Sequence, residues 1–179
     1  MTDFNAILDA GDVDEGIITT VIEIPKGSML KAEYDRKQKL FVLDRVEPAI
    51  FAKPTSYGFI PQTLDEDGDE LDTLVITDEP LPMGLVVQEA RVIGVLNFED
   101  GGEMDHKIVV VPADDRNTGG DIDSLDDLPK GLCKQIEHHF NHYKDLKKPG
   151  TTHVLGWGDS GEAKKIIKEC QERWAKDAA

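Results

Sequence analysis

Residues 85–98 read LVVQEARVIGVLNF and residues 107–111 read KIVVV, two β-branched stretches on either side of the turn Glu99-Asp100-Gly101-Gly102. Short stretches of this kind, bounded by turn residues, predict β-strands. Further strands are expected near residues 17–24, 40–46, 73–77 and 152–157, separated by segments rich in Pro, Gly and Asp. Many short strands with few intervening helices favour a closed antiparallel sheet over a doubly wound one, so the sequence predicts a small β-barrel.

Two helices are expected to close the chain. After Pro129, apolar residues recur every three or four positions until Pro149-Gly150, as in an amphipathic helix, at Leu132, Ile136, Phe140 and Tyr143. A second helix begins near Asp159 or Ser160, where Asp159 and Glu162 have capping-box spacing, and runs through Ala163, Ile166, Cys170 and Trp174. We therefore expect a mostly β, α+β fold with two flanking helices, in a single domain over residues 1–179.

Composition and charge exclude several classes of protein. The 36 Asp and Glu against 20 Lys and Arg give a formal charge of −16, which repels phosphate backbones and anionic lipid, so no nucleic-acid or membrane partner is expected. Cys133 and Cys170 lie far apart without C-x-x-C spacing, which indicates buried thiols in a reducing compartment. Because residues 1–5 lack the features of a signal peptide and the apolar runs are short, we expect a soluble, cytoplasmic protein.

Residues 65–72 read DEDGDELD, a Gly-containing turn before the strand expected at 73–77. Crowded carboxylates repel one another, and hard divalent cations normally neutralise such a cluster. A metal site and an acidic surface turn are both open interpretations of this motif alone. An EF-hand loop is excluded, because its sixth and twelfth positions need Gly and Glu, and this stretch has Glu70 and Ile76 there.

A second acidic turn, EDGGEMD at residues 99–105, directly precedes His106-Lys107. If the strands that flank the two turns are neighbours in a barrel, both turns open at one mouth and can hold more than one ion. Taken alone, this turn also fits a solvated hairpin tip. The acidic stretch at residues 114–127 is expected to be a surface loop, because blocks of like charge are usually solvated.

Charged residues also occur inside expected extended segments. Strand alternation puts Lys31 and Glu33 on one face, which would place a cation beside a metal-binding carboxylate. Glu23 lies between two isoleucines, and Arg45 could offer its guanidinium fork to a phosphoryl group. Each of these residues, taken singly, also fits a surface ion pair.

Two motif-like patterns are not expected to be sites. Residues 156–161 match G-x-G-x-x-G between a strand and a helix, but no strand follows that helix to complete a βαβ unit. His138 and His142 are four residues apart, but His139 replaces the glutamate of the H-E-x-x-H zinc motif, so an exposed helix face is expected there. The sequence also has no P-loop motif.

Seven segments together resemble, in order and spacing, the soluble family I inorganic pyrophosphatases. They are Ile22-Glu23-Ile24-Pro25, Lys31-x-Glu33, Asp44-Arg45, Tyr57-Gly58, Asp67-Gly68-Asp69-x-x-Asp72, Asp100 with Asp105-x-Lys107, and residues 142–146, HYKDL. The likeness runs from about Ile17 to Gly156-Trp157 and the final helix, and Asp-Gly-Asp-x-x-Asp is the signature of that family. The resemblance implies an OB-like five-stranded barrel, several Mg²⁺ ions per site, hydrolysis of pyrophosphate to two phosphates, and a homo-oligomer that is usually a hexamer in short prokaryotic chains.

The resemblance also implies a role for each matching residue. Asp69 resembles the general base beside a metal-bridging water. The implied metal ligands are Glu23, Glu33, Asp67, Asp72, Asp100 and Asp105. The residues implied to bind the phosphoryl groups are Lys31, Arg45, Tyr57, Lys107, Tyr143 and Lys144.

Two departures from the family pattern concern local packing. Lys53 stands where many relatives have an aromatic residue before the proline, and Ser56 precedes Tyr57 where Asn or Asp is common. The rival interpretations are an OB-type protein that holds calcium in its acidic turns without catalysis, and a dinucleotide-dependent oxidoreductase. The first would lack a converging set of Lys, Arg and Tyr, and the second would need another βαβ half after Gly161.

Overall fold

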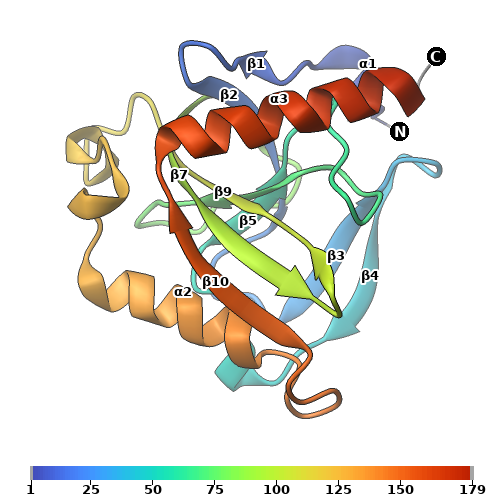
Figure 1. Ribbon diagram of the computed structural model, residues 1–179, viewed down its shortest axis with the longest axis vertical. Coiled ribbons are helices and arrows are strands. Elements are labelled where there is room, and N and C mark those ends of the chain that lie inside the picture. Colours follow the sequence, from blue (N-terminus) through green and yellow to red (C-terminus); the bar gives the residue numbers. More distant parts are fainter. Residues whose placement is uncertain (1, 178–179) are drawn as a thin grey trace.

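Five strands close into a ring in this computed structural model, which describes residues 2–177. Hydrogen-bonded neighbours follow one another around the ring, and the last strand pairs with the first. The order is β2 (Ile17–Ile24), β5 (Ser56–Phe59), β6 (Asp72–Val75), β9 (Lys107–Pro112) and β7 (Val86–Asp100) (Figure 1). The expected closed, OB-like ring of five strands is confirmed.

The ring is mainly antiparallel, as expected, but one of its pairs is parallel, which the sequence did not predict. β6 and β9 run in the same direction, with Asp72 opposite Lys107, whereas the other ring pairs are antiparallel. The reason is topological. The chain passes from β6 to β7 and then to β9, and β9 pairs antiparallel with β7, so that it runs in the same direction as β6. Periodicity indicates that a segment is a strand, but it does not indicate which strand lies beside it.

Further strands extend this sheet or stand apart from it. β10 (Thr152–Gly158) pairs with the second half of β7, from Val95 to Asp100, and the two-residue strands β1 (Gly11–Asp12) and β8 (Glu103–Met104) pair with β2 and β7. β3 (Leu30–Asp35) and β4 (Leu40–Val46) form a separate hairpin. Strand alternation around Lys31 and Glu33 agrees with β3, whereas β5 was not predicted as a strand, since it is short and carries no run of β-branched residues.

The two long helices lie where the sequence predicts them. α2 spans Lys130–His142, with Pro129 as its N-cap instead of its first residue, and α3 spans Ser160–Asp177. The backbone N–H of Glu162 donates to Asp159 Oδ1 at 2.8 Å, as the capping pattern predicts. Figure 1 shows α3 crossing one end of the ring and α2 lying beside β10. The remaining helical segments are the short α1 (Phe4–Ile7) and the single 3₁₀ turns η1 (Ala49–Phe51), η2 (Gly119–Asp121) and η3 (Leu125–Asp127).

β9 is buried on both of its faces. Ile108 and Val110 pack in the cluster beneath α3, whereas Val109 and Val111 pack in the cluster beneath α2. A strand enclosed in this way needs a continuous apolar run, which explains KIVVV. It also fixes Lys107, its first residue, in a rigid position at the end of the ring. None of the helices within residues 2–177 is both long enough and apolar enough to cross a membrane.

Candidate active site

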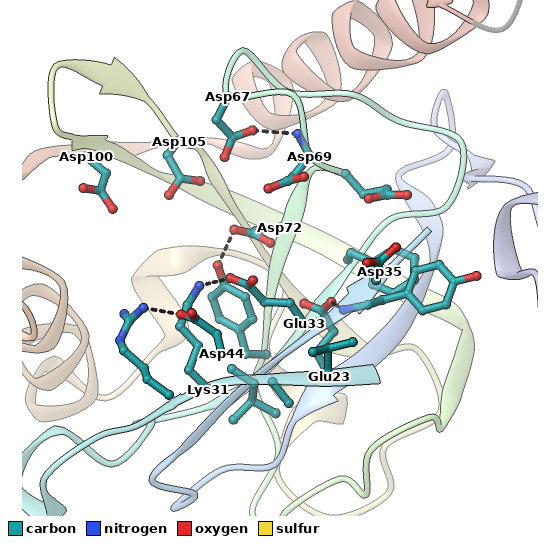
Figure 2. Close-up of a pocket in the computed structure, with 18 of the residues that line it drawn as sticks. Glu23, Lys31, Glu33, Asp35, Asp44, Asp67, Asp69, Asp72, Asp100 and Asp105 are labelled. Carbon is teal, nitrogen blue, oxygen red and sulfur yellow. Dashed lines mark hydrogen bonds and ion pairs between the residues drawn. The ribbon is translucent and has the colours of Figure 1, made fainter. Parts of the chain in front are cut away.

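A cavity of about 750 Å³ opens between the end of the ring and the β3–β4 hairpin. All thirteen residues that the sequence singled out line it. They are Glu23, Lys31, Glu33, Arg45, Tyr57, Asp67, Asp69, Asp72, Asp100, Asp105, Lys107, Tyr143 and Lys144. Figure 2 shows the aspartates of the two acidic turns on one side of the cavity and Glu23, Lys31 and Glu33 on the other.

The first acidic turn is a rigid loop between β5 and β6. The backbone N–H of Asp65 donates to the carbonyl of Asp69 at 2.8 Å, and Asp67 Oδ1 accepts from the backbone N–H of Asp69 at 3.0 Å. Gly68 has a φ of +91°, a conformation that suits glycine. The buried carboxylate of Asp65 accepts from Arg173 of α3 and from the backbone N–H of His106, both at 3.1 Å. These contacts fix the loop, so Asp67 and Asp69 face the cavity.

Asp72 and Asp105 share one ammonium group. Lys107 Nζ donates to Asp72 Oδ2 and to Asp105 Oδ1, each at 2.5 Å, and the Tyr57 hydroxyl also donates to Asp72. Burial disfavours the charge of Lys107, but the two aspartates raise its pKa above the usual value. Burial also raises the pKa of Asp72, to about 7. The charge of Lys107 opposes this rise, and the charge of Asp105 adds to it. The three groups form one coupled charge cluster at the start of β6 and β9.

Asp67 stands at the mouth of the cavity. Desolvation by the cavity walls, together with the charge of Asp105, raises its pKa to about 6. Desolvation and the charge of Glu33 likewise raise the pKa of Asp69. Asp69 has no ion-pair partner among residues 2–177, so its carboxylate faces the cavity without a resident cation.

The second acidic turn meets the end of α2. Tyr143 is the C-cap of α2, and its hydroxyl donates to Asp100 Oδ2 at 3.0 Å, while Lys144 forms an ion pair with the same oxygen. Burial opposes ionisation of Asp100, but Lys144 and Tyr143 together lower its pKa. Tyr143 is also buried in the core beneath α2, so it belongs both to the apolar helix face and to the site.

The β2, β3 and β4 strands supply the remaining predicted residues. Lys31 and Glu33 form an ion pair on one face of β3, as strand alternation predicts, and Lys31 lies opposite Arg45 across the hairpin. Arg45 is held by Asp44, at 2.5 Å, and by Glu47. Glu23 is buried in β2 and accepts from the backbone N–H of Tyr34 at 2.6 Å. Its burial, helped by the charge of Asp72, raises its pKa well above the usual value.

Several cavity residues were not singled out from the sequence. Asp35, Arg36 and Lys37 line the cavity, and so does Lys53, for which the sequence indicated only a departure in local packing. Lys53 is only 6 % exposed. One signal was present in the sequence, a lysine in the apolar context Phe51-Ala52-Lys53-Pro54. Ser56, the other departure, has a structural role, since its hydroxyl accepts from the backbone N–H groups of Lys26 and Leu81.

The charge balance of the cavity fits divalent cations. Ten carboxylates line it against seven lysines and arginines, and carboxylate oxygens are the ligands that hard cations prefer. Within residues 2–177, no three His, Cys, Asp or Glu side chains converge as the ligands of one ion, because lysines hold several of the carboxylates. Burial, together with the charge of Asp105, raises the pKa values of Asp67 and Asp72, and a bound divalent cation would favour their charged forms. The donor set therefore fits a metal that would displace these lysine contacts.

The other sequence patterns lie outside this cavity. His138 and His142 are exposed on α2 with ring centroids 4.5 Å apart, and His142 Nδ1 lies 2.8 Å from Asp145. Residues 156–161 link β10 to α3. The acidic stretch at 114–127 is at the surface, as expected, although Ile122 anchors it in the core beneath α2.

Comparisons with known proteins agree with this geometry. The family described as inorganic pyrophosphatase matches residues 20–175. The inorganic pyrophosphatase of Neisseria meningitidis serogroup B is 67 % identical over 178 residues, which cover 99 % of this chain and all of that protein. That of Haemophilus influenzae is 65 % identical over 97 % of this chain and 98 % of its own.

Solved structures give the same result. The crystal structure of an inorganic pyrophosphatase from Neisseria gonorrhoeae superposes with a TM-score of 0.95 at 66 % identity, over 97 % of this chain and 99 % of that one. The inorganic pyrophosphatase from Thermus thermophilus has a TM-score of 0.86 at 40 % identity, over 94 % and 97 % of the two chains. This chain therefore belongs to the inorganic pyrophosphatase family, whose metal-dependent members hydrolyse pyrophosphate.

Proposed function

We propose that the cavity between the ring and the β3–β4 hairpin is where this chain hydrolyses pyrophosphate, with Mg²⁺ as its metal. One observation carries the proposal: thirteen residues, predicted from seven separate segments, line a single cavity. Pyrophosphate is a small, highly charged anion, and the chain has a formal charge of −16. Binding such a substrate requires a local inversion of the electric field, which Mg²⁺ together with lysine and arginine would provide.

The carboxylates would hold the metal. Asp67, Asp72 and Asp105 would bind the first Mg²⁺, with Asp72 also contacting a second ion, and the further ligands would be Glu23, Glu33 and Asp100. A divalent ion supplies positive charge toward the phosphoryl oxygens and lowers the pKa of water that it coordinates. The clustering of these carboxylates around one cavity supports the assignment.

The cationic and phenolic side chains would bind the two phosphoryl groups. Lys31 and Arg45 lie opposite each other on β3 and β4, while Lys107, Tyr57, Tyr143 and Lys144 face the cavity from the ring and from the end of α2. Arginine binds phosphoryl oxygens in a fork, and lysine binds them as a point charge. These groups would stabilise the negative charge that develops on the departing phosphate.

Asp69 would act as the general base. Its carboxylate would take a proton from water as the water oxygen bonds to one phosphorus. The bond from that phosphorus to the bridging oxygen breaks, and the electron pair leaves with the second phosphate. The raised pKa of Asp69 and its lack of an ion-pair partner within the described chain support this role, because a more basic carboxylate accepts a proton more readily.

Phosphate release from pyrophosphate tests the proposal. The chain should release phosphate with Mg²⁺ and lose this activity in excess EDTA. Undiminished release in EDTA would rule out the metal assignment. Calcium binding without any phosphate release would favour the non-catalytic, calcium-holding alternative.

We also propose a homohexamer in the cytoplasm. The family resemblance supports the hexamer, and so do apolar side chains that are exposed on and beside the β3–β4 hairpin, among them Leu43, Val46 and Ile50. Exposed apolar patches of this kind are typical of interfaces. The free thiols of Cys133 and Cys170 suit a reducing compartment, and fractionation of the source cells would test the location.

A further inference from the structure

Backbone hydrogen bonds on both sides of Lys53 fix the position of this residue. Its backbone N–H donates to the carbonyl of Ser28 at 3.0 Å, and its own carbonyl accepts from Gly27 at 2.8 Å. It lies two residues after the end of η1 and precedes Pro54, and the whole residue is 6 % exposed. The backbone is therefore fixed on both sides of a lysine that points inward.

Aromatic rings surround the ammonium group of Lys53. Nζ lies 5.1 Å from the ring centroid of Tyr57, 5.3 Å from that of Tyr143 and 5.9 Å from that of Phe140. Ring faces attract cations, but each contact replaces only part of the hydration that burial removes. Both tyrosines also turn their hydroxyls to carboxylates of the cavity, so Lys53 lies directly beside the substrate-binding groups.

No anion neutralises this ammonium in the part of the chain that the structure describes. The other buried or half-buried cations assigned to substrate each have a carboxylate partner: Glu33 for Lys31, Glu47 for Arg45, Asp105 for Lys107 and Asp100 for Lys144. Among residues 2–177, the contacts of Lys53 Nζ are with aromatic rings, and it takes part in none of the side-chain hydrogen bonds or ion pairs there. A buried charge without a partner is costly, so this arrangement calls for an explanation.

The surroundings of Lys53 are positive. Burial, and then the charges of Lys31, Lys107 and Arg45, lower the pKa of Lys53 to about 7, although the charge of Asp72 opposes them. An anion placed among these four side chains would raise the pKa of Lys53 and favour its charged form. Each of the other cations must weaken or break its ion pair with a carboxylate to bind a phosphoryl group. Lys53 has no such ion pair to break.

We propose that Lys53 is a further substrate-binding residue, whose ammonium donates to a phosphoryl oxygen bound between Tyr57 and Tyr143. The inference rests on the proposed function of the cavity. It adds an amine that is already in place before the substrate binds and whose charged form the phosphoryl group would favour. An aromatic residue at this position could not supply that charge.

Three variants test the role of Lys53. K53M keeps the length and apolar stem of the side chain but removes the charge, and K53R restores a charge. K134M removes a charge from an exposed lysine of α2, which lines the neighbouring surface hollow together with Lys53 but not the active-site cavity. The readouts are KM and kcat for pyrophosphate with Mg²⁺, calorimetric binding of methylenediphosphonate, Mg²⁺ affinity without substrate, and Tm.

K53M should bind methylenediphosphonate about 10- to 100-fold more weakly and raise KM by a similar factor, the usual scale for a hydrogen bond to a charged group. Its Mg²⁺ affinity should be unchanged, and its Tm should stay the same or rise, because an unpaired buried charge is removed. K53R should recover most of the binding, and K134M should match the wild type.

Four results would overturn the inference: wild-type diphosphonate binding by K53M, K53R binding no better than K53M, K134M losing as much binding as K53M, or K53M failing to fold. The last result would mean that the ammonium stabilises the core. If the wild type itself releases no phosphate, the proposed function fails. If the wild type is active and K53M equals it, only the assignment of Lys53 fails.

Discussion

At the scale of single residues, several charges in this cavity are held by a specific partner. Lys107 illustrates this, because one ammonium holds Asp72 and Asp105 together. Arg45 differs, because Asp44 and Glu47 on its own strand and the next turn hold it, and neither belongs to the predicted metal ligands. Removing Lys107 and removing Arg45 should therefore have different consequences.

Arg45→Ala should lower kcat/KM for pyrophosphate by about 10- to 100-fold, the scale of one or two charged hydrogen bonds. The Mg²⁺ affinity of the free protein should stay within about twofold of wild type, because a guanidinium cannot ligate a cation. Kinetics and calorimetry measure the two effects separately. Arg116→Ala, which removes an exposed arginine paired with Asp114, is the control and should change neither quantity. Loss of Mg²⁺ binding in Arg45→Ala would contradict the assignment.

Most of the candidate site could be predicted from the sequence through its resemblance to a family, because seven segments match that family in order and spacing. The residue types alone left Asp67, Asp69 and Asp72 open between a metal site and an acidic surface turn. Lys53 could not be identified in the same way. Its apolar context was a weak signal of burial, and the ring of Tyr143, which lies far along the chain, could not be placed beside it from the sequence.

At the scale of elements, β5 shows that the close approach of two backbones can determine the residue in a strand more strongly than strand propensity does. A Cβ at Gly58 would lie 2.2 Å from the carbonyl oxygen of Val21 in β2, which is too close for any side chain. Glycine lowers strand propensity, so SYGF gives a weak strand signal, yet the ring cannot close with another residue there. The parallel pairing of β6 with β9 was missed for a related reason, since it depends on neighbours and not on local pattern.

Gly58→Ala should therefore destabilise the fold by about 1–3 kcal/mol or more, the usual cost of overpacking. Chemical denaturation measures the change. Gly131→Ala is a matched control, because a Cβ at Gly131 in α2 meets nothing within 4 Å. Alanine there should raise the stability by up to about 1 kcal/mol. Equal effects of the two variants would contradict the role given to Gly58.

His139 should make α2 sensitive to acid. Burial, with the nearby charges of Lys53 and His138, lowers the pKa of His139 to about 3, whereas an unfolded histidine titrates near 6.5. The unfolded chain therefore binds a proton that the folded chain does not. The stability that neutral His139 contributes is full above about pH 6.5 and is lost as the pH falls toward 3.

The fall in Tm between pH 7 and pH 5 should be smaller for His139→Phe than for the wild type. The rings of His139 and Tyr143 stack with their centroids 5.5 Å apart. Phenylalanine keeps a ring at this position but does not titrate. His153→Gln, which replaces an exposed histidine, should keep the wild-type fall. Identical pH dependence in His139→Phe and wild type would show that His139 is not the titrating group.

At the scale of the whole molecule, the fold separates a stable core from a charged cavity. The ring and its two helices bury the apolar side chains, and the acidic turns and the β3–β4 hairpin place charge at one end. Periodicity and turn residues predicted the strands and helices of the core. The hexamer has no comparable signal in one sequence, because an interface depends on a surface that only the folded chain presents.

Light scattering should give a mass of six times the 19.8 kDa of one chain at micromolar concentration. The exposed apolar residues on and beside the β3–β4 hairpin should then lose solvent exposure, which hydrogen exchange at different protein concentrations would detect. A species of 19.8 kDa alone would contradict the hexamer, without affecting the assignment of the cavity.

The roles of Asp69 and Asp72 are the centre of this account, and a Mg²⁺ titration of phosphate release tests them most directly. Asp72→Asn should need more Mg²⁺ and recover part of its activity as Mg²⁺ is raised, because a ligand charge is lost. Asp69→Asn should bind Mg²⁺ nearly as well as wild type but lose about 10²- to 10⁴-fold in rate, the scale of a general base, at every Mg²⁺ concentration. Raising the pH should help Asp69→Asn, since hydroxide needs no base. Rescue of Asp69→Asn by Mg²⁺, with no rescue of Asp72→Asn, would contradict the account.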